Sequence, residues 1–207
     1  MKQSTRRFRV AISVSALVAA ALSGCTNFHP GNPQSTDKAG QTMTSATPGP
    51  PPGWKVQEAI PQSQQQAQNT VVGYLRRTLA ELPSGSVIDG GRYLGPGKTP
   101  YCDDNDSSPT APRRFSTIGQ LKLPPGSESV DLIAKVGETW RSWDWYVVER
   151  DGFTKPNRFG YAPDGYRLQI VAASQQGYPP TIQGSSPCFP GAIAREDIPI
   201  PVVINAE

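Results

Sequence analysis

In the stretch 61–82, apolar side chains recur at intervals of three and four residues, which is the spacing of one helix face. Pro61 suits the first turn of a helix, and Pro83-Ser84-Gly85 ends it. The sequence therefore predicts an amphipathic helix here. Its buried positions are expected to be Ala67, Val71, Leu75, Leu79 and Leu82. Arg76 and Arg77 fall on the polar side, where they face solvent or a partner.

Further along the chain, the pattern predicts a second helix and several strands. A helical stripe through residues 129–143 includes Trp140 and Trp143. Elsewhere, apolar and polar residues alternate, or short apolar runs are bounded by proline and glycine, as in strands. We expect strands at residues 86–94, 113–124, 145–150, 166–172 and 180–184.

The predicted order is one helix, two strands, a second helix and three strands. Because short turns join consecutive strands, antiparallel pairing is favoured. We expect an α+β fold with an antiparallel sheet of about five strands and two helices packed on one face.

The N-terminus has the pattern of an export signal. Four basic residues precede an apolar run of 13 residues at positions 10–22. A membrane-spanning helix needs about 20 residues, so this run is typical of a signal peptide. Thr5-Arg6-Arg7 and Phe8 are close to a twin-arginine signal, but Phe8 stands one place early. General secretory export is the default, and the twin-arginine route stays open.

The apolar run ends in Leu22-Ser23-Gly24-Cys25, which resembles the bacterial lipobox. The resemblance implies cleavage before Cys25 and attachment of a diacylglycerol to its thiol. Two or more acyl chains anchor a protein stably, since each buried methylene contributes about 0.8 kcal/mol. The expected location is the extracytoplasmic face of the cell membrane.

Composition then divides the chain into three predicted parts. Residues 1–24 are the signal peptide. Residues 25–59 are the lipidated cysteine and a tether rich in Pro, Gly, Ser and Thr, with too little apolar surface to fold. Residues 60–207 form a single α+β domain, long enough for its own core.

Cleavage also changes the charge. The whole chain has 20 basic and 17 acidic residues and a net charge of +3. Residues 1–24 hold four basic and no acidic residues, so the mature chain keeps 16 against 17, a net charge of −1. This leaves no basic excess to favour nucleic acid or another polyanion as a partner.

If Cys25 is acylated, Cys102 and Cys188 are the two cysteines left, in an exported protein that meets oxidising conditions. A bond between them would close a loop of about 87 residues and stabilise the fold by up to about 4–5 kcal/mol in the chain-entropy model. A catalytic cysteine would need a histidine nearby, and the one histidine, His29, lies in the tether. A zinc site would need more Cys or His ligands.

The acidic stretch Asp103-Asp104-Asn105-Asp106 next to Cys102 has two further interpretations. As a calcium loop it fails the EF-hand pattern, because Ser108 stands where glycine is needed and Arg114 where glutamate is needed. Asp and Asn also favour turns by bonding their own backbone. We therefore expect a solvated turn beside a disulfide.

Aromatic residues offer the candidate ligand site. The cluster is Trp140, Trp143, Trp145 and Tyr146. Exposed rings of this kind stack on sugars or acyl chains, but Trp140 and Trp143 also lie on the predicted buried stripe, so core packing competes with this interpretation. Further aromatic residues in or beside loops are candidates for lining a groove: Tyr93, Phe153, Phe159, Tyr161 and Tyr178.

Catalytic patterns are missing from the sequence. No Ser/His/Asp set, nucleophile elbow, Ser-x-x-Lys motif or phosphate-binding loop occurs. Asp144 paired with Asp164 or Glu149 would suit a glycosidase, but any domain with this many acids offers such pairs. We expect no catalysis, no cofactor and no metal site.

Taken whole, the mature chain resembles the small lipoproteins of actinobacterial, and specifically mycobacterial-type, cell envelopes. The resemblance rests on the lipobox, the Pro/Thr-rich tether, the tryptophans at 140–145, and the motifs at 101–104, 163–166 and 186–189. It implies a surface location and a disulfide-linked α+β domain, and it transfers no catalytic residue. We expect a non-catalytic domain that binds another envelope protein. The alternative is a carrier of lipid or glycan with an aromatic-lined groove.

Overall fold

The structure, a computed structural model, describes residues 49–127, 131–195 and 198–207. The predicted signal peptide, the predicted lipidation site at Cys25 and the first part of the predicted tether lie outside the described residues.

Two α-helices and eight strands occur in these three ranges. The helices are α1 (Gln64–Ala80) and α2 (Leu132–Arg141). The strands are β1 (Val87–Asp89), β2 (Gly97–Lys98), β3 (Ser116–Lys122), β4 (Tyr146–Val148), β5 (Asn157–Tyr161), β6 (Arg167–Val171), β7 (Thr181–Ser185) and β8 (Val203–Ile204). A short 3-10 helix, η1 (Gly191–Ile193), precedes β8.

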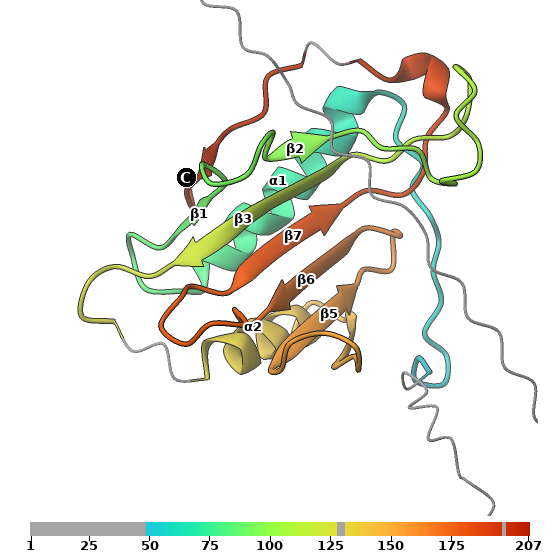
Figure 1. Ribbon diagram of the computed structural model, residues 1–207. Helices are drawn as coiled ribbons and strands as arrows, with labels where there is room; N and C mark the ends of the chain where they lie inside the picture. Colours follow the sequence, from blue (N-terminus) through green and yellow to red (C-terminus); the bar gives the residue numbers. More distant parts are fainter. Residues whose placement is uncertain (1–48, 128–130, 196–197) are drawn as a thin grey trace, which may run out of the picture. The chain divides into compact units, whose positions relative to one another are not determined.

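All strand pairs are antiparallel, and the sheet runs in the order β4-β5-β6-β7-β3-β1-β8, with β2 also paired to β3. Strands β4 to β7 form a meander. Strand β7 then pairs with β3, which is the longest strand and carries β1 and β2 on its other edge (Figure 1). The pairing of β3 with β7 therefore joins two parts of the chain into one sheet.

The α+β class and both helices are confirmed, and a strand overlaps each of the five predicted ranges. The predicted number of about five strands is wrong, because the sheet has eight. Strands β2 and β8 have two residues each, too few to show alternation. Strand β5 was missed because two of its residues, Arg158 and Gly160, stand at positions facing the helices, where an apolar side chain would be expected.

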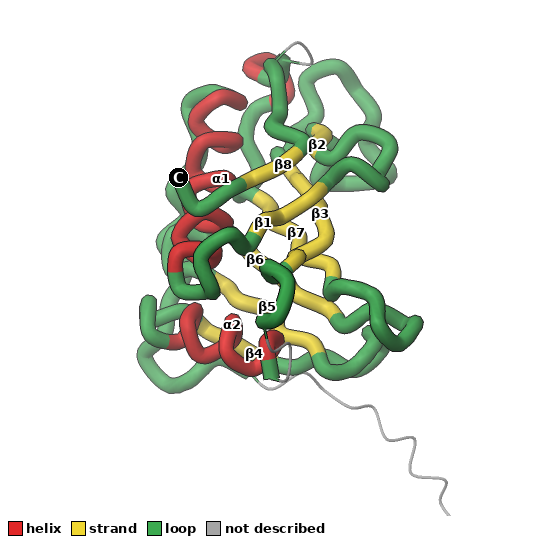
Figure 2. The backbone as a smooth tube through the Cα atoms, turned by 90° about the vertical axis from the view of Figure 1, so that its left-hand side faces the viewer, coloured by secondary structure: helices red, strands yellow, loops and turns green. Residues whose placement is uncertain are grey.

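Both helices cover the same face of the sheet. Gly160, Leu168 and Gly184 are cross-strand neighbours on β5, β6 and β7, so they face the same side. A Cβ added at Gly160 would meet Trp140 of α2, and one added at Gly184 would meet Val71 of α1. Figure 2 shows the two helices on one side of the strands.

Trp140 connects the parts of this core. Its side chain is fully buried, and its ring lies against the space left by Gly160. Its Nε1 donates a hydrogen bond to Oγ1 of Thr78 on α1, at 3.0 Å. An unpaired buried indole N–H would cost about 1–3 kcal/mol, so this bond lets a large ring with one polar atom fill the core.

The predicted disulfide is confirmed. The Sγ atoms of Cys102 and Cys188 are 2.06 Å apart. The bond ties the long loop before β3 to the segment after β7. Beside it, Arg113 makes backbone bridges to both Tyr101 and Phe189, so the covalent link lies within a small patch of paired backbone.

The acidic stretch beside Cys102 forms turns that satisfy its own backbone. Oδ1 of Asp103 accepts from the N–H of Asn105 at 2.9 Å, and Oδ1 of Asp106 accepts from the N–H of Ser108 at 3.0 Å. The bond from Ser108 holds the pKa of the Asp106 carboxyl below its usual range. These are the local turns that the solvated-turn interpretation requires.

The last residues of the predicted tether lie against the domain. The N–H groups of Gln57 and Ala59 donate to the carbonyl oxygens of Pro163 and Asp164, at 2.7 and 2.9 Å. Contacts of the domain therefore begin before residue 60, the predicted domain boundary.

Removing the disulfide should destabilise the domain. We expect Cys102→Ser and Cys188→Ser each to lower the free energy of unfolding by about 2–4 kcal/mol, because either change restores the same loop entropy to the unfolded chain. Urea unfolding without reductant is the measurement. The double variant should lose no more than either single variant, and additive losses would show that the two thiols act independently.

A methyl group at Gly160 should be costly. Its Cβ would lie 2.7 Å from Cε3 of Trp140 and 3.1 Å from Cε3 of Trp145. We expect Gly160→Ala to lower the free energy of unfolding by about 1–3 kcal/mol, the usual cost of overpacking. Gly73→Ala is the control, since Gly73 is exposed on α1 with open space around it, and there the change should stabilise by about 0.5–1 kcal/mol. Equal urea midpoints for the two variants would contradict this account.

Candidate functional site: an apolar groove at one end of the sheet

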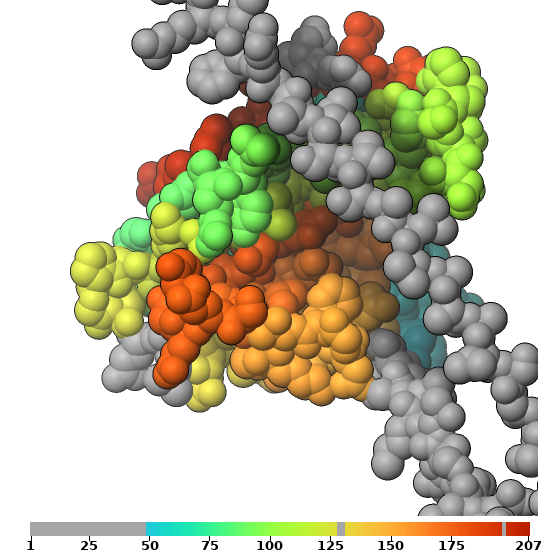
Figure 3. Space-filling model, viewed as in Figure 1, coloured from blue at the N-terminus to red at the C-terminus, as the bar shows by residue number. Residues whose placement is uncertain are grey.

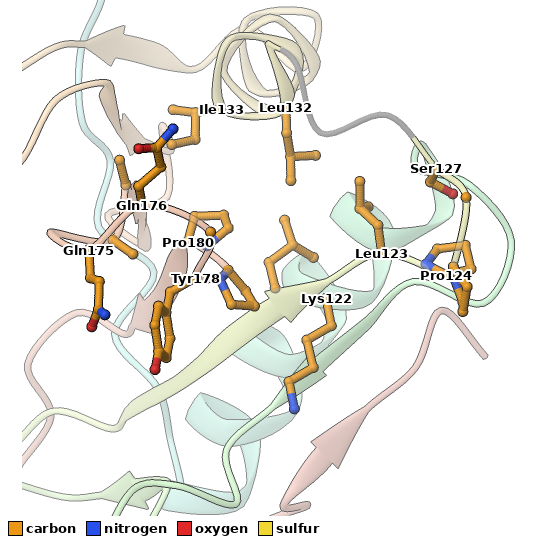
Figure 4. Close-up of a pocket in the computed structure, with 17 residues that line it drawn as sticks. Lys122, Leu123, Pro124, Ser127, Leu132, Ile133, Gln175, Gln176, Tyr178 and Pro180 are labelled. Carbon is orange, nitrogen blue, oxygen red and sulfur yellow. The ribbon is translucent and has the colours of Figure 1, made fainter.

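A groove of about 660 Å³ lies where the end of β3, the start of α2 and the connection between β6 and β7 meet (Figure 4). Its volume is within the range of about 300–1,000 Å³ that ligand pockets usually have. The groove is open to solvent rather than enclosed.

Proline pairs create the groove. The ladder between β3 and β7 ends at Gln120 and Thr181, followed by one more bond from the N–H of Leu121 to the carbonyl of Pro180, at 2.9 Å. Beyond that point Pro124-Pro125 follows β3, and Pro179-Pro180 precedes β7. Because proline has no N–H, neither segment can extend the ladder. The segment after β3 and the segment before β7 therefore separate, and the space between them stays open.

The floor of the groove is apolar. In Figure 4, Leu132 and Ile133 extend from α2 toward Leu123 and Pro180, which lie across the hollow. Leu132 and Ile133 are buried and belong to the hydrophobic core, and Leu123 is partly buried and packs against that core. A ligand that filled the space would cover the apolar surface that remains exposed there, and such burial contributes about 25 cal/mol per Å².

The rim of the groove is polar. Gln175 and Gln176 stand on one side with Tyr178, whose side chain is 52% exposed (Figure 4). Among the hydrogen bonds of the described residues, none involves the side-chain amide of either glutamine. Lys122 also lines the groove, but its Nζ lies 2.6 Å from Oδ2 of Asp89, and its ammonium group points away from the hollow. The rim therefore offers uncharged amides to a ligand.

The predicted aromatic cluster does not form one platform. Trp140 is fully buried, and Trp145 is buried beside it, with their ring centroids 6.3 Å apart. Trp143 is partly buried and packs edge-on against Trp145, and the guanidinium of Arg77 lies 4.1 Å from the centroid of its indole ring. The two buried tryptophans thus fit the core-packing interpretation.

Tyr146 lies apart from the three tryptophans. It is the first residue of β4 and stands in one cross-strand row with Tyr161 of β5. The two rings stack with centroids 5.6 Å apart, on the sheet face that the helices leave uncovered. None of the four predicted platform residues lines the groove.

One loop aromatic from the sequence analysis does line it, namely Tyr178. The apolar floor was not predicted as a site, because its leucine and isoleucine residues have the same pattern as ordinary core. The two proline pairs were the available signal, since they mark strand ends that cannot pair further.

Two of the three acids considered for catalysis, Asp164 and Glu149, have structural partners. The hydroxyl of Tyr74 donates to Oδ2 of Asp164 at 2.6 Å. Burial, together with this bond and the charge of Asp164, raises the pKa of Tyr74 well above its ordinary value. Glu149 pairs with Arg158 and Lys155, and the bond from Arg158 is the main cause that lowers the pKa of Glu149. Both acids hold neighbouring elements together.

Two negative findings apply to residues 49–127, 131–195 and 198–207. No group of three or more His, Cys, Asp or Glu residues there is placed to hold a metal ion. No helix in these ranges is both long enough and apolar enough to cross a membrane.

Comparison with known proteins found no relative of this chain. No protein-family model matches the chain, and no curated protein or solved structure matches it either. The site must therefore be interpreted from its own residues.

Proposed function

We propose that the chain is an exported lipoprotein, anchored through Cys25 to the extracytoplasmic face of the cell membrane, whose domain binds another envelope protein without catalysing a reaction. The anchor rests on the basic residues, the apolar run and the Leu-Ser-Gly-Cys motif of positions 1–25. The disulfide between Cys102 and Cys188 supports export, because disulfides persist in oxidising compartments.

The groove at the end of the sheet carries the binding proposal. Its apolar floor fits one or two aliphatic or aromatic side chains of a partner. The unengaged amides of Gln175 and Gln176 suit the backbone N–H and C=O groups on either side of those side chains. An extended segment of a protein presents this combination of apolar side chains and regularly spaced amide groups.

A carrier of lipid is the second candidate, because the continuous apolar floor would also accept an acyl chain. Two features favour the protein partner. The groove is open to solvent, so an acyl chain in it would keep one side wet, and the amide rim has no counterpart on a hydrocarbon chain. A glycan carrier built on the tryptophan cluster is disfavoured, since Trp140 and Trp145 are buried.

The chemistry of the groove favours binding over catalysis. Among the described residues that line the groove, Lys122 and Tyr178 are the only ones with an ionisable side chain, and Lys122 is held by Asp89. A general acid or base must lie within hydrogen-bond reach of a bound substrate. The ammonium group of Lys122 is paired with Asp89 and points away from the groove.

The anchor is tested on the full-length protein in the bacterium that makes it. We expect mass spectrometry to find acylated Cys25 as the first residue, and Cys25→Ser to move the protein from the membrane fraction to the soluble fraction, because the acyl chains are lost. Ser23→Ala is the matched control: it keeps a small residue before the cysteine and should leave the protein anchored. Retention of Cys25→Ser in the membrane would contradict the anchor.

The groove is tested with a photoactivatable phenylalanine in place of Tyr178, and in place of Leu94, an exposed apolar residue outside the groove. We expect crosslinks to one protein from position 178 alone. A synthetic peptide of the crosslinked segment should then bind the purified protein, and Tyr178→Ala and Leu123→Gln should each weaken binding about tenfold, as the loss of an anchor contact does.

Leu94→Ala should leave the affinity of the peptide unchanged. Equal crosslinking from both positions would contradict a specific partner at the groove. Native mass spectrometry that found a lipid released on unfolding would favour the carrier instead.

A further inference from the structure

Neither α1 nor α2 covers the opposite face of the sheet, and the middle of this face is polar. The amide of Gln169 on β6 donates to Oε1 of Gln183 on β7 at 3.1 Å, and the amide of Gln183 donates to Oγ of Ser116 on β3 at 2.9 Å. Figure 3 shows this face of the molecule. Amide and hydroxyl groups therefore form a row across three strands.

Three arginines surround a hollow of about 200 Å³ on this face, and they are Arg114, Arg150 and Arg167. Gln169, Gln183 and Ser185 line the same hollow, and none of its described lining residues carries a carboxylate. Within the described ranges, no salt bridge involves any of the three arginines. Glu149, which precedes Arg150 in the sequence, pairs with Arg158 and Lys155 instead. The hollow is therefore a concentration of positive charge without an internal counterion.

Arg150 is held in place by aromatic rings. Its guanidinium carbon lies 5.1 Å from the ring centroid of Phe159 and 5.8 Å from that of Phe153. Its Nε is buried and has no hydrogen-bond partner among the residues that the structure describes. A buried donor without a partner costs free energy, and an acceptor on a ligand would recover it. The planar guanidinium has the geometry to bind a carboxylate or phosphate.

Aromatic rings continue from the hollow toward the edge of the sheet. Tyr161 lines the hollow and stands in one cross-strand row with Arg167, and Tyr146 stacks on Tyr161 at an interplanar angle of 27°. The ring of Trp54 lies 5.4 Å from Tyr146. Ring faces beside amides and hydroxyls suit a ligand with apolar C–H faces and many hydroxyl groups, which describes a sugar ring.

We infer that this hollow binds a saccharide that carries a phosphate or carboxylate group. The anionic group lies among Arg114, Arg150 and Arg167. The sugar ring packs toward Tyr161, and its hydroxyls bond to Gln169, Gln183 and Ser185. The site shares no lining residue with the apolar groove, so the two proposals stand or fall separately.

The test is an NMR titration of the folded, disulfide-bonded protein with glucose 6-phosphate, glucuronate, glucose and inorganic phosphate. We expect saturable shifts with the first two ligands, centred on Arg167, Gln169 and Gln183. Inorganic phosphate should bind at least about fivefold more weakly than glucose 6-phosphate, because it makes the charged contacts without the ring contacts. Glucose should produce no saturable shift.

Arg167→Gln is the main variant, because Arg167 is exposed and its loss leaves the core intact. We expect it and Arg150→Gln each to weaken glucose 6-phosphate binding roughly fivefold or more, since each removes a charge-assisted hydrogen bond. Arg76→Gln is the matched control, an exposed arginine on α1 outside the hollow, and should bind like the parent protein.

Four results would overturn the inference. They are no saturable shift with either anionic sugar, equal binding of glucose, binding of inorganic phosphate as tight as that of glucose 6-phosphate, and unchanged binding by Arg167→Gln. Tight binding to phosphatidylglycerol vesicles without binding to glucose 6-phosphate would overturn the saccharide in favour of a lipid headgroup.

Discussion

The fold depends on Trp140 and on the space that Gly160 leaves for it. The indole of Trp140 fills the gap between α2 and β5, and its N–H reaches across to Thr78 on α1. One side chain thus sets the distance of one helix from the sheet and its position against the other helix. Because this contact places both helices on one face, it decides which surface is core and which surface meets solvent.

A sheet covered on one side has an uncovered face whose side chains must be compatible with water or with a ligand. Here that face carries the Gln169–Gln183–Ser116 row and three arginines, while the covered face carries leucine, isoleucine and glycine. The apolar groove has another origin. It lies at the strand ends, where proline pairs stop the ladder between β3 and β7 and leave a hollow lined by apolar residues.

Net charge is a poor guide to the partners of such a domain. Without residues 1–24 the chain would have a formal charge of −1, which argued against an anionic partner. The sheet nevertheless gathers Arg114, Arg150 and Arg167, which are far apart in the sequence, around one hollow, while Glu149, next to Arg150 in the sequence, pairs with Arg158 and Lys155. Local charge density, and not the total, determines what binds at such a surface.

The sequence by itself determined the two helices, the α+β class, most of the strands and the Cys102–Cys188 disulfide, because periodicity and cysteine count are local or numerical properties. It did not determine β5, since Arg158 and Gly160 make sense only when α2 lies over them. Nor did it separate Tyr146 from the tryptophans, because neighbouring residues pass to opposite sides of a sheet once a strand forms. The groove and the arginine hollow were decided by tertiary structure alone. Each assembles residues from several strands, and only the pairing register brings those side chains within reach of one ligand.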